Sequence, residues 1–284
     1  MPLPPEAVNP TSGRPVTRPI LTQSWTDLTY LHWPYEPATV RPFLPPGVEP
    51  YVSDGATWVG FIPFAMRRVA VLGARLPYVS DFLETNVRLY GVDAAGRRSV
   101  VFLSLDADRL LAVGAPGPRT GFPTSGPRWT CAGTTTKVTY TTRRRISGVR
   151  SLIRVRVGDA VEAEPLDHFL PARWALHSSF YGGTAYAPID HQPWPLRSAE
   201  LLELDDGLIA ASGLPPPRVH RGSCTRPVST SASGGPSGWT RLTDGPRLNV
   251  WSRPSRRRPS TSSCSSAHRP TSSPCPTRTR SPTR

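Results

Sequence analysis

The chain has 284 residues and a formal net charge of +14, a balance that by itself suggests a nucleic-acid or membrane-surface partner. The distribution of charge argues against both, because residues 219–284 hold twelve Arg and a single acidic residue, which leaves only +3 on the first 218 residues. No apolar run approaches the roughly 18 residues that a membrane helix needs, and no signal peptide is recognisable, so we expect a cytoplasmic protein.

The N-terminal third begins without regular structure. Residues 1–20 are rich in Pro and lack hydrophobic periodicity, which predicts a flexible arm. Residues 21–33 mix apolar and polar side chains, and residues 38–44 fit a short helix or turn. Residues 57–66 are apolar at both alternating sets of positions, as is typical of a strand in the middle of a packed sheet.

Residues 81–107 form the most informative stretch, two alternating runs around a turn rich in Asp, Ala and Gly. They predict a β-hairpin with a five-residue loop, residues 93–97. The only register that keeps the two apolar faces together sets Tyr90 opposite Val100 and Asn86 opposite Ser104. One face of this hairpin is then aliphatic. The other carries polar side chains: Glu84, Asn86, Arg88, Tyr90, Ser104 and Asp106.

The second half continues with short elements. Residues 138–145 and 152–157 predict another hairpin, residues 164–167 a short helix, residues 173–181, 184–189 and 196–204 further strands, and residues 208–212 a last short helix or strand. No long amphipathic helix and no internal repeat is visible. The pattern favours a mostly β, antiparallel sandwich or barrel over residues 21–214, with a few short helices.

The tail, residues 215–284, is rich in Pro, Ser, Thr and Arg, and its composition predicts disorder. Lys137 is the sole Lys among 34 basic residues, a bias expected of a GC-rich bacterial gene, in which a shifted reading frame seldom meets a stop codon. Back-translation of residues 123–136 and of residues 219–240 gives more strand-like sequence in another frame. We therefore hypothesise two frameshifts, at these places. The alternative is a natural, disordered basic tail.

Several phrases occur in an order that resembles the YqjF-like (DUF2071) family of uncharacterised bacterial proteins. They include LHWPYEPATVRPFLPPGVEP, DGATWVGFIPFAMRRV, FLETNVRLY, VVFLSLDA and HQPWPLRSAELLEL. The resemblance extends from about Thr22 to Leu214. It implies an acetoacetate-decarboxylase-like fold, an antiparallel β-barrel or cone with an internal cavity. The family has no established activity to transfer.

The residue inventory disfavours the Schiff-base chemistry of acetoacetate decarboxylases, which requires a lysine amine that loses its proton near neutral pH. Lys137 alone is available, and it lies just before a strand. The four Cys and six His lack metal-ligand spacing, so we expect neither a metal nor a cofactor. Whether the protein is an enzyme stays open.

The candidate ligand-binding residues are those of the polar hairpin face together with two residues of the segment HQPWP. An enclosed Glu84 and Arg88 pair could orient a small carboxylate or carbonyl compound. The complete set of predicted ligand-binding residues is Glu84, Asn86, Arg88, Tyr90, Ser104, His191 and Trp194.

Two other readings stay open. The first is a non-enzymatic binding or scaffolding protein whose polar face is merely solvated. The second is nucleic-acid binding through the Arg-rich tail, which we do not expect if the tail results from a frameshift. The sequence does not indicate an oligomeric state.

Overall fold

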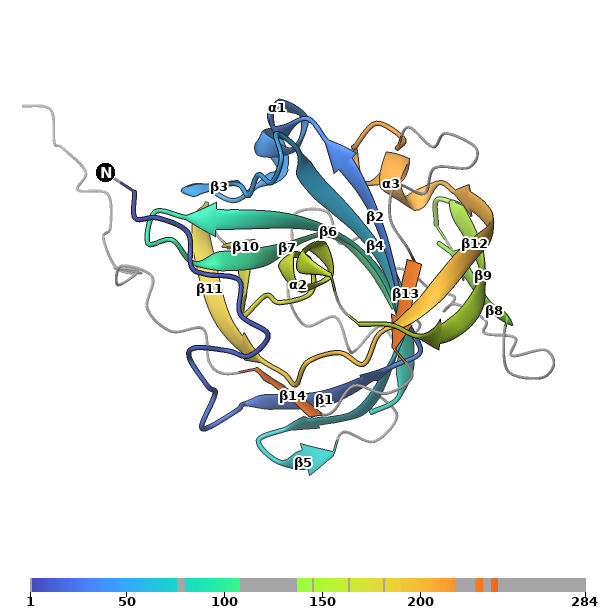
Figure 1. Cartoon of the computed structure of the whole chain (residues 1–284), viewed down its shortest axis with the longest axis horizontal. Coiled ribbons are helices and arrows are strands. Elements are labelled where there is room, and N and C mark those ends of the chain that lie inside the picture. The colour runs from blue at the N-terminus through green and yellow to red at the C-terminus, as the bar shows by residue number, and fades with distance from the viewer. Residues whose placement is uncertain are drawn as a thin grey trace, which may run out of the picture. The chain divides into compact units, whose positions relative to one another are not determined.

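A computed structural model describes residues 2–75, 80–107, 137–144, 146–162, 164–180, 182–217, 228–231 and 236–239 (Figure 1). Short strands dominate these residues, and they form one 14-stranded sheet. The prediction of a mostly β, antiparallel fold with a few short helices is therefore confirmed. The first proposed frameshift, at residues 123–136, lies outside the described residues, as does most of the second.

The strands of the N-terminal half are β1 (Leu21–Thr26), β2 (Leu28–Tyr35), β3 (Val48–Pro50), β4 (Thr57–Val71), β5 (Ala74–Arg75), β6 (Phe82–Asp93) and β7 (Arg98–Ala107). Those of the C-terminal half are β8 (Lys137–Arg143), β9 (Arg150–Ala160), β10 (Ala175–Phe180), β11 (Gly183–Asp190), β12 (Arg197–Asp206), β13 (Val228–Ser231) and β14 (Pro236–Trp239). The helices are α1 (Pro37–Val40), the 3-10 helix η1 (Arg41–Phe43), α2 (Pro165–Phe169) and α3 (Leu208–Ala211).

A ring of paired strands is the main feature of the sheet. The pairing runs from β4 through β6, β7, β10, β11, β14 and β1, and it returns to β4. Neighbours are antiparallel except for β7 and β10. Figure 1 looks into this ring, with α2 drawn inside the circle of strands. Phe169 and Leu170, at the end of α2, pack against Tyr90 and Val100, so α2 fills part of the interior.

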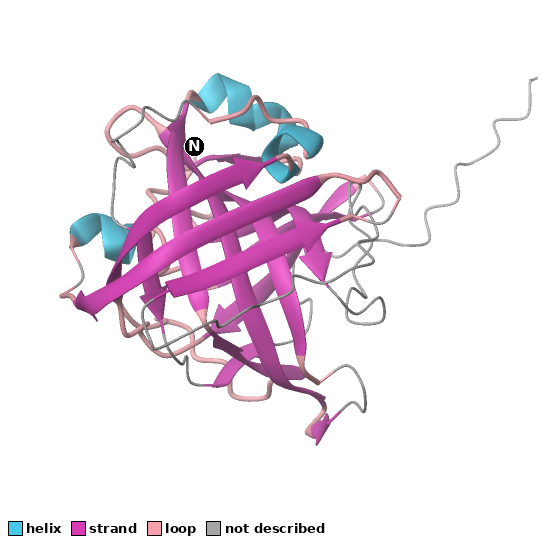
Figure 2. Cartoon of the chain, turned by 90° about the vertical axis from the view of Figure 1, so that its right-hand side faces the viewer, coloured by secondary structure: helices cyan, strands magenta, loops and turns pink. Residues whose placement is uncertain are grey.

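A second series of strands leaves the ring at β4, which pairs with β2 as well as with β1 along the same edge. The series continues through β13, β12 and β9 to β8. Figure 2 shows the long strands as a curved sheet with the helices at its margins. The aliphatic core lies between this series and the outer face of β4, β6 and β7, where Phe61, Leu89 and Val101 meet Ile153 and Val155.

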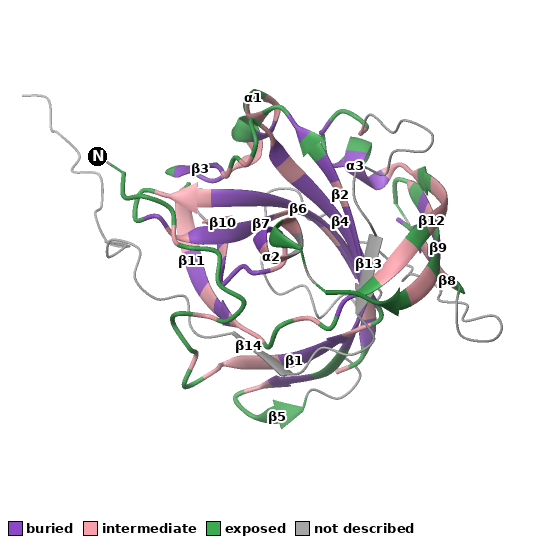
Figure 3. Ribbon diagram, viewed as in Figure 1, coloured by how far each residue is buried: buried purple, intermediate pink, exposed green. Residues whose placement is uncertain are grey.

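Both faces of β4 and β6 are consequently covered, and Figure 3 shows these strands buried along most of their length. On β6, Val87 and Leu89 belong to the aliphatic core outside the ring. The alternate residues of β6, beginning with Phe82, face the interior of the ring. A strand with two buried faces explains why β4 is apolar at both sets of positions.

The register of the β6–β7 hairpin confirms one half of its prediction and corrects the other. Tyr90 pairs with Val100, and Val92 pairs with Arg98, so the loop comprises residues 93–97 as expected. The pairing of Asn86 with Ser104 is wrong, because a β-bulge at Leu103, opposite the step from Val87 to Arg88, shifts the register by one residue. Ser104 therefore pairs with Val87 and lies on the outer face.

Two regions outside the predicted domain also make contacts. Residues 2–20, expected to be a flexible arm, lie along the β6–β7 hairpin and β11 through the hydrogen bonds described below. Within residues 215–284, β13 pairs with β2 and β12, and β14 pairs with β1 and β11. Within the part of the chain that the structure describes, no helix is long and apolar enough to cross a membrane.

Candidate functional site

The polar residues of β6 lie inside the ring. Glu84, Asn86, Arg88 and Tyr90 occupy alternate positions of one strand, and each is at most 5% exposed. Alternation in a strand sends every second side chain to the same face, and closure of the ring encloses that face. The structure thus gathers four of the seven predicted residues in one buried cluster.

An amide connects the acid and the base of this cluster. Asn86 Nδ2 donates a hydrogen bond to Glu84 Oε1 over 3.2 Å, and Arg88 Nε donates to Asn86 Oδ1 over 3.0 Å. Among the described residues, no ion pair joins Glu84 to Arg88, and Arg88 Nη2 has no hydrogen-bond partner. Burial raises the pKa of Glu84 to about 7, although the Asn86 hydrogen bond and the Arg88 charge oppose this rise. Burial thus favours the protonated form of the Glu84 carboxyl group at a higher pH than for an exposed glutamate.

Tyr90 extends the cluster to β2. Its hydroxyl lies 2.6 Å from His32 Nε2. Burial, together with the charges of Arg88 and Arg173, lowers the pKa of His32 to about 3, so the imidazole is neutral. Burial also raises the pKa of the Tyr90 phenol. Gly60 leaves space for the side chains of Arg88 and Tyr90, because a Cβ atom at this position would lie 2.9 Å from both Arg88 Cγ and the Tyr90 hydroxyl.

Arg173 is a further member of the site, outside the set of seven predicted ligand-binding residues. It directly precedes β10 and is 2% exposed, and none of its three guanidinium nitrogens has a hydrogen-bond partner among the described residues. Its Cζ atom lies 4.7 to 4.9 Å from the ring centroids of Phe169, Tyr51 and Tyr90. Burial, together with the charge of Arg98, lowers the pKa of Arg173 well below its usual value.

A second buried guanidinium accompanies Arg173. Arg98 is 1% exposed, and its Cζ atom lies over the same two rings, 5.1 Å from Tyr51 and 5.5 Å from Phe169. Arg98 Nη2 donates to the Phe169 carbonyl over 2.9 Å, and Nη1 donates to the Ala7 carbonyl over 3.4 Å. Cation–π contacts offset only part of the cost of burying such charges. Within the described residues, the three guanidinium groups of Arg88, Arg98 and Arg173 form no ion pair with a carboxylate.

Ser104 belongs to a different cluster. Its hydroxyl donates to Asp106 Oδ2 over 2.7 Å, and both residues contact the guanidinium of Arg144. This group lies between β7 and the end of β8, on the outer face of the ring. The bulge removes Ser104 from the Glu84 side of the hairpin, so we no longer include it in the candidate site.

His191 and Trp194, the remaining predicted residues, line a small pocket of about 40 Å³. Its other lining residues are Pro10, His168, Pro171, Ala172, Pro193 and Leu196. Trp194 stacks on Trp25 with the ring centroids 5.7 Å apart, and Trp25 in turn lies 6.0 Å from the Arg88 guanidinium. An aromatic path therefore connects the pocket to the polar cluster. Burial lowers the pKa of His191.

Lys137 lies at the exposed start of β8, away from the residues that face the interior of the ring. A Schiff base at this amine would therefore form on the surface. Among the described residues, no group of three or more His, Cys, Asp or Glu side chains could hold a metal ion.

These features define a mostly antiparallel β protein with a positively charged polar cluster buried inside a ring of strands. The model of the DUF2071 family, whose members are described as uncharacterized conserved proteins, matches residues 22–229, and the chain belongs to this family. The resemblance seen in the sequence is thus confirmed. The chain is 29% identical over 191 residues to the uncharacterized protein YqjF of Bacillus subtilis (strain 168), a match that covers 64% of this chain and 76% of YqjF.

Solved structures similar to this chain include the enduracididine biosynthesis enzyme MppR with HEPES buffer bound. That comparison has a TM-score of 0.48 and 17% identity, and it covers 79% of this chain and 86% of MppR. An acetoacetate decarboxylase-like enzyme from Sphingomonas wittichii RW1 is similar with a TM-score of 0.47 and 14% identity, over 79% of this chain and 91% of that enzyme.

Proposed function

We propose that this protein binds a small organic carboxylate inside the ring of strands, with Arg173 and Arg88 as its anionic contacts. The observation that carries the proposal is the Arg173 guanidinium, which is 2% exposed and has no hydrogen-bond partner among the described residues. A buried charge without a partner costs several kcal/mol, so a fold that retains one has a use for it. A carboxylate matches a planar guanidinium with two parallel hydrogen bonds.

The neighbouring residues support an anion over a cation or a neutral ligand. Arg88, Arg98 and Arg173 are all buried, and the last two lie over the same rings of Tyr51 and Phe169, whereas burial raises the pKa of Glu84 to about 7. The positive groups therefore outnumber the negative ones, and an anionic ligand would compensate them. Arg88 offers its Nη2, which has no hydrogen-bond partner within the described part of the chain, and the His32–Tyr90 pair offers a polar group that carries no charge of its own.

The ligand would be held with few polar contacts and many apolar ones. Phe102 and Trp25 flank the Arg88 guanidinium at 5.8 and 6.0 Å, and Tyr51, Tyr90 and Phe169 flank that of Arg173. Small-molecule sites commonly combine aromatic walls with a few fixed polar groups. Entry through the pocket at His191 and Trp194 fits this arrangement, since Ala172, the residue before Arg173, also lines that pocket.

The test is calorimetric titration with acetate, with acetamide as the uncharged control of the same shape. We expect the full-length protein to bind acetate and not acetamide. Arg173→Met and Arg88→Met should each abolish or strongly weaken acetate binding. The matched control is Arg154→Gln, because Arg154 is a surface arginine whose side chain is 45% exposed and pairs with Glu203. Equal acetate affinity in Arg173→Met and the unaltered protein would overturn the proposal and leave a scaffolding role as the better reading.

A further inference from the structure

The N-terminal arm, defined as residues 2–20, is attached to the ring by a small set of polar contacts. Near its start, the Leu3 amide donates to the Ala94 carbonyl and the Glu6 amide donates to the Gly96 carbonyl, each over 2.9 Å. Ala94 and Gly96 belong to the loop that joins β6 to β7. In Figure 1 the arm then passes beside β10 and β11 on its way to β1.

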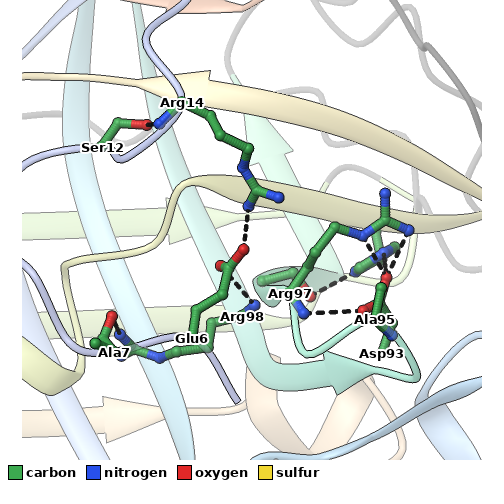
Figure 4. Close-up of polar contacts among 10 residues, drawn as sticks. Glu6, Ala7, Ser12, Arg14, Asp93, Ala95, Arg97 and Arg98 are labelled. Atoms are coloured by element: carbon green, nitrogen blue, oxygen red, sulfur yellow. Dashed lines mark hydrogen bonds and ion pairs between the residues drawn. The ribbon is translucent and has the colours of Figure 1, made fainter. Parts of the chain in front are cut away.

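The arm covers one of the buried guanidiniums. Glu6 Oε2 accepts a hydrogen bond from the Arg98 amide over 3.3 Å, and Glu6 Oε1 pairs with Arg14 Nη2 over 2.7 Å (Figure 4). The Ala7 carbonyl accepts from Arg98 Nη1. Arg98 and Arg173 lie over the same rings of Tyr51 and Phe169. The arm therefore contacts Arg98, and Arg98 shares its aromatic neighbours with Arg173, the proposed anion contact.

The arm also forms part of the pocket. Pro10 is one of the lining residues and faces His168, His191 and Trp194 there. Farther along, the Val16 amide donates to Asp190 Oδ2 over 3.2 Å, at the end of β11. The arm therefore makes hydrogen bonds to the ring both before and after Pro10, the residue that lines the pocket.

We propose that the N-terminal arm is a strap that closes the carboxylate site and must lift to admit the ligand. This inference rests on the proposed function. The strap would confine the ligand by placing Pro10 over the pocket and Ala7 and Glu6 over Arg98.

The contacts of the arm are weak enough that the arm should detach more easily than the strands of the ring separate. The Arg14 and Glu6 side chains are 44% and 33% exposed, and exposed ion pairs contribute little to stability. The side chains of Leu3 and Val8 are 61% and 38% exposed, so the arm buries little apolar surface. Segments with few buried apolar contacts open locally at a small fraction of the global unfolding free energy.

Gly96 provides a specific way to release the strap. A Cβ atom at Gly96 would lie 2.2 Å from the Pro4 carbonyl oxygen, a distance that forces the arm to move. Gly96 has a φ of +76°, so alanine there also strains the turn. Gly148 is a matched control, because it has a φ of +70° in the β8–β9 turn and has no atom within 4 Å of the corresponding Cβ position. Comparing the two alanine variants separates displacement of the arm from strain in a turn.

The experiment measures two quantities on full-length Gly96→Ala, Gly148→Ala and unaltered protein. Hydrogen exchange at the Leu3 and Glu6 amides reports whether the arm is attached. Stopped-flow tryptophan fluorescence, for which Trp25 and Trp194 are the nearby reporters, gives the association and dissociation rates of acetate. We expect Gly96→Ala to lose protection at both amides and to bind and release acetate several-fold faster, whereas Gly148→Ala should match the unaltered protein in both measurements.

Arg14→Gln is a second variant, which removes the exposed ion pair of the arm without changing a turn. It should shift both measurements in the same direction as Gly96→Ala and by less. If the Leu3 and Glu6 amides lose protection while the acetate rates stay the same, the arm is not a gate, and the proposed function stands. If the unaltered protein binds no acetate, the proposed function fails and the strap fails with it.

Discussion

Arg144 donates hydrogen bonds to both carboxylate oxygens of Asp106, at 2.7 and 2.8 Å, and thereby ties the end of β8 to β7. The side chains are 10% and 1% exposed, so water screens the pair little. Ser104 donates a further hydrogen bond to the same carboxylate. The bulge at Leu103 makes this arrangement possible, because it turns Ser104 and Asp106 to the outer face of the ring.

This pair predicts a large stability difference between two substitutions that each break one ion pair. Asp106→Asn leaves the Arg144 charge without its counter-ion and should destabilise the protein by about 3 to 5 kcal/mol. Glu203→Gln breaks the exposed pair with Arg154 and should cost at most about 1 kcal/mol. Urea unfolding followed by circular dichroism measures both values. Equal losses in the two variants would show that burial adds nothing to the Asp106 pair.

Arg173→Met should stabilise the ligand-free protein, although under the proposed function it should also abolish carboxylate binding. The substitution replaces a buried charge that has no hydrogen-bond partner among the described residues with an apolar side chain. Replacing buried charges by apolar residues of similar volume has been neutral or stabilising, by about 1 to 4 kcal/mol. Thermal unfolding without added carboxylate is the measurement. A clear drop in the unfolding temperature would mean that the Arg173 guanidinium is paired in the ligand-free protein.

Glu84 should make the stability of the protein fall as the pH rises. Its folded pKa of about 7 lies above the ordinary value of 4.5, so the folded state binds this proton more tightly than the unfolded chain. The resulting stabilisation is fully present below about pH 4.5 and is lost as the pH rises through about 7, a change of about 3 kcal/mol. Glu84→Gln has no proton to lose. Urea unfolding at pH 5 and pH 8 should therefore show the unaltered protein losing stability relative to Glu84→Gln, and parallel pH profiles would contradict this account.

Gly60→Ala should disturb the polar cluster directly. The new methyl group would lie 2.9 Å from Arg88 Cγ and from the Tyr90 hydroxyl, and 3.1 Å from His32 Nε2. Overpacking of this kind typically costs about 1 to 3 kcal/mol. Gly13→Ala is the control, since no atom lies within 4 Å of a Cβ atom there and its φ is not positive. Thermal unfolding compares the variants, and acetate affinity should fall for Gly60→Ala alone.

The sequence predicted the part of the site that depends on alternation within one strand. Four residues share a face because they lie at every second position: Glu84, Asn86, Arg88 and Tyr90. The apolar pattern on both faces of residues 57–66 correctly indicated a sheet that is covered on both sides. Ser104 was misplaced because the bulge carries no Gly or Pro that would announce it. The β6–β7 turn and its five-residue loop were predictable from local turn chemistry.

The features that the sequence did not predict depend on contacts between residues distant in the chain. Only the packing of Tyr51, Tyr90 and Phe169 around Arg173 reveals a guanidinium that has no hydrogen-bond partner among the described residues. The contacts of the N-terminal arm were missed because a Pro-rich segment without periodicity gives no sign of its partners. In both cases the decisive information is which residues distant in the chain lie against one another, and a single sequence does not contain it.

The alternation along β6 has a consequence for divergence within the family. Val87 and Leu89 point into the aliphatic core, while Asn86, Arg88 and Tyr90 point into the ring. If the proposed function holds, substitutions at positions 84, 86 and 88 should alter ligand selectivity and leave this aliphatic core unchanged, whereas substitutions at positions 87 and 89 would disrupt its packing. A library randomised at positions 84, 86 and 88 alone should accordingly yield a high proportion of folded proteins with altered anion preference.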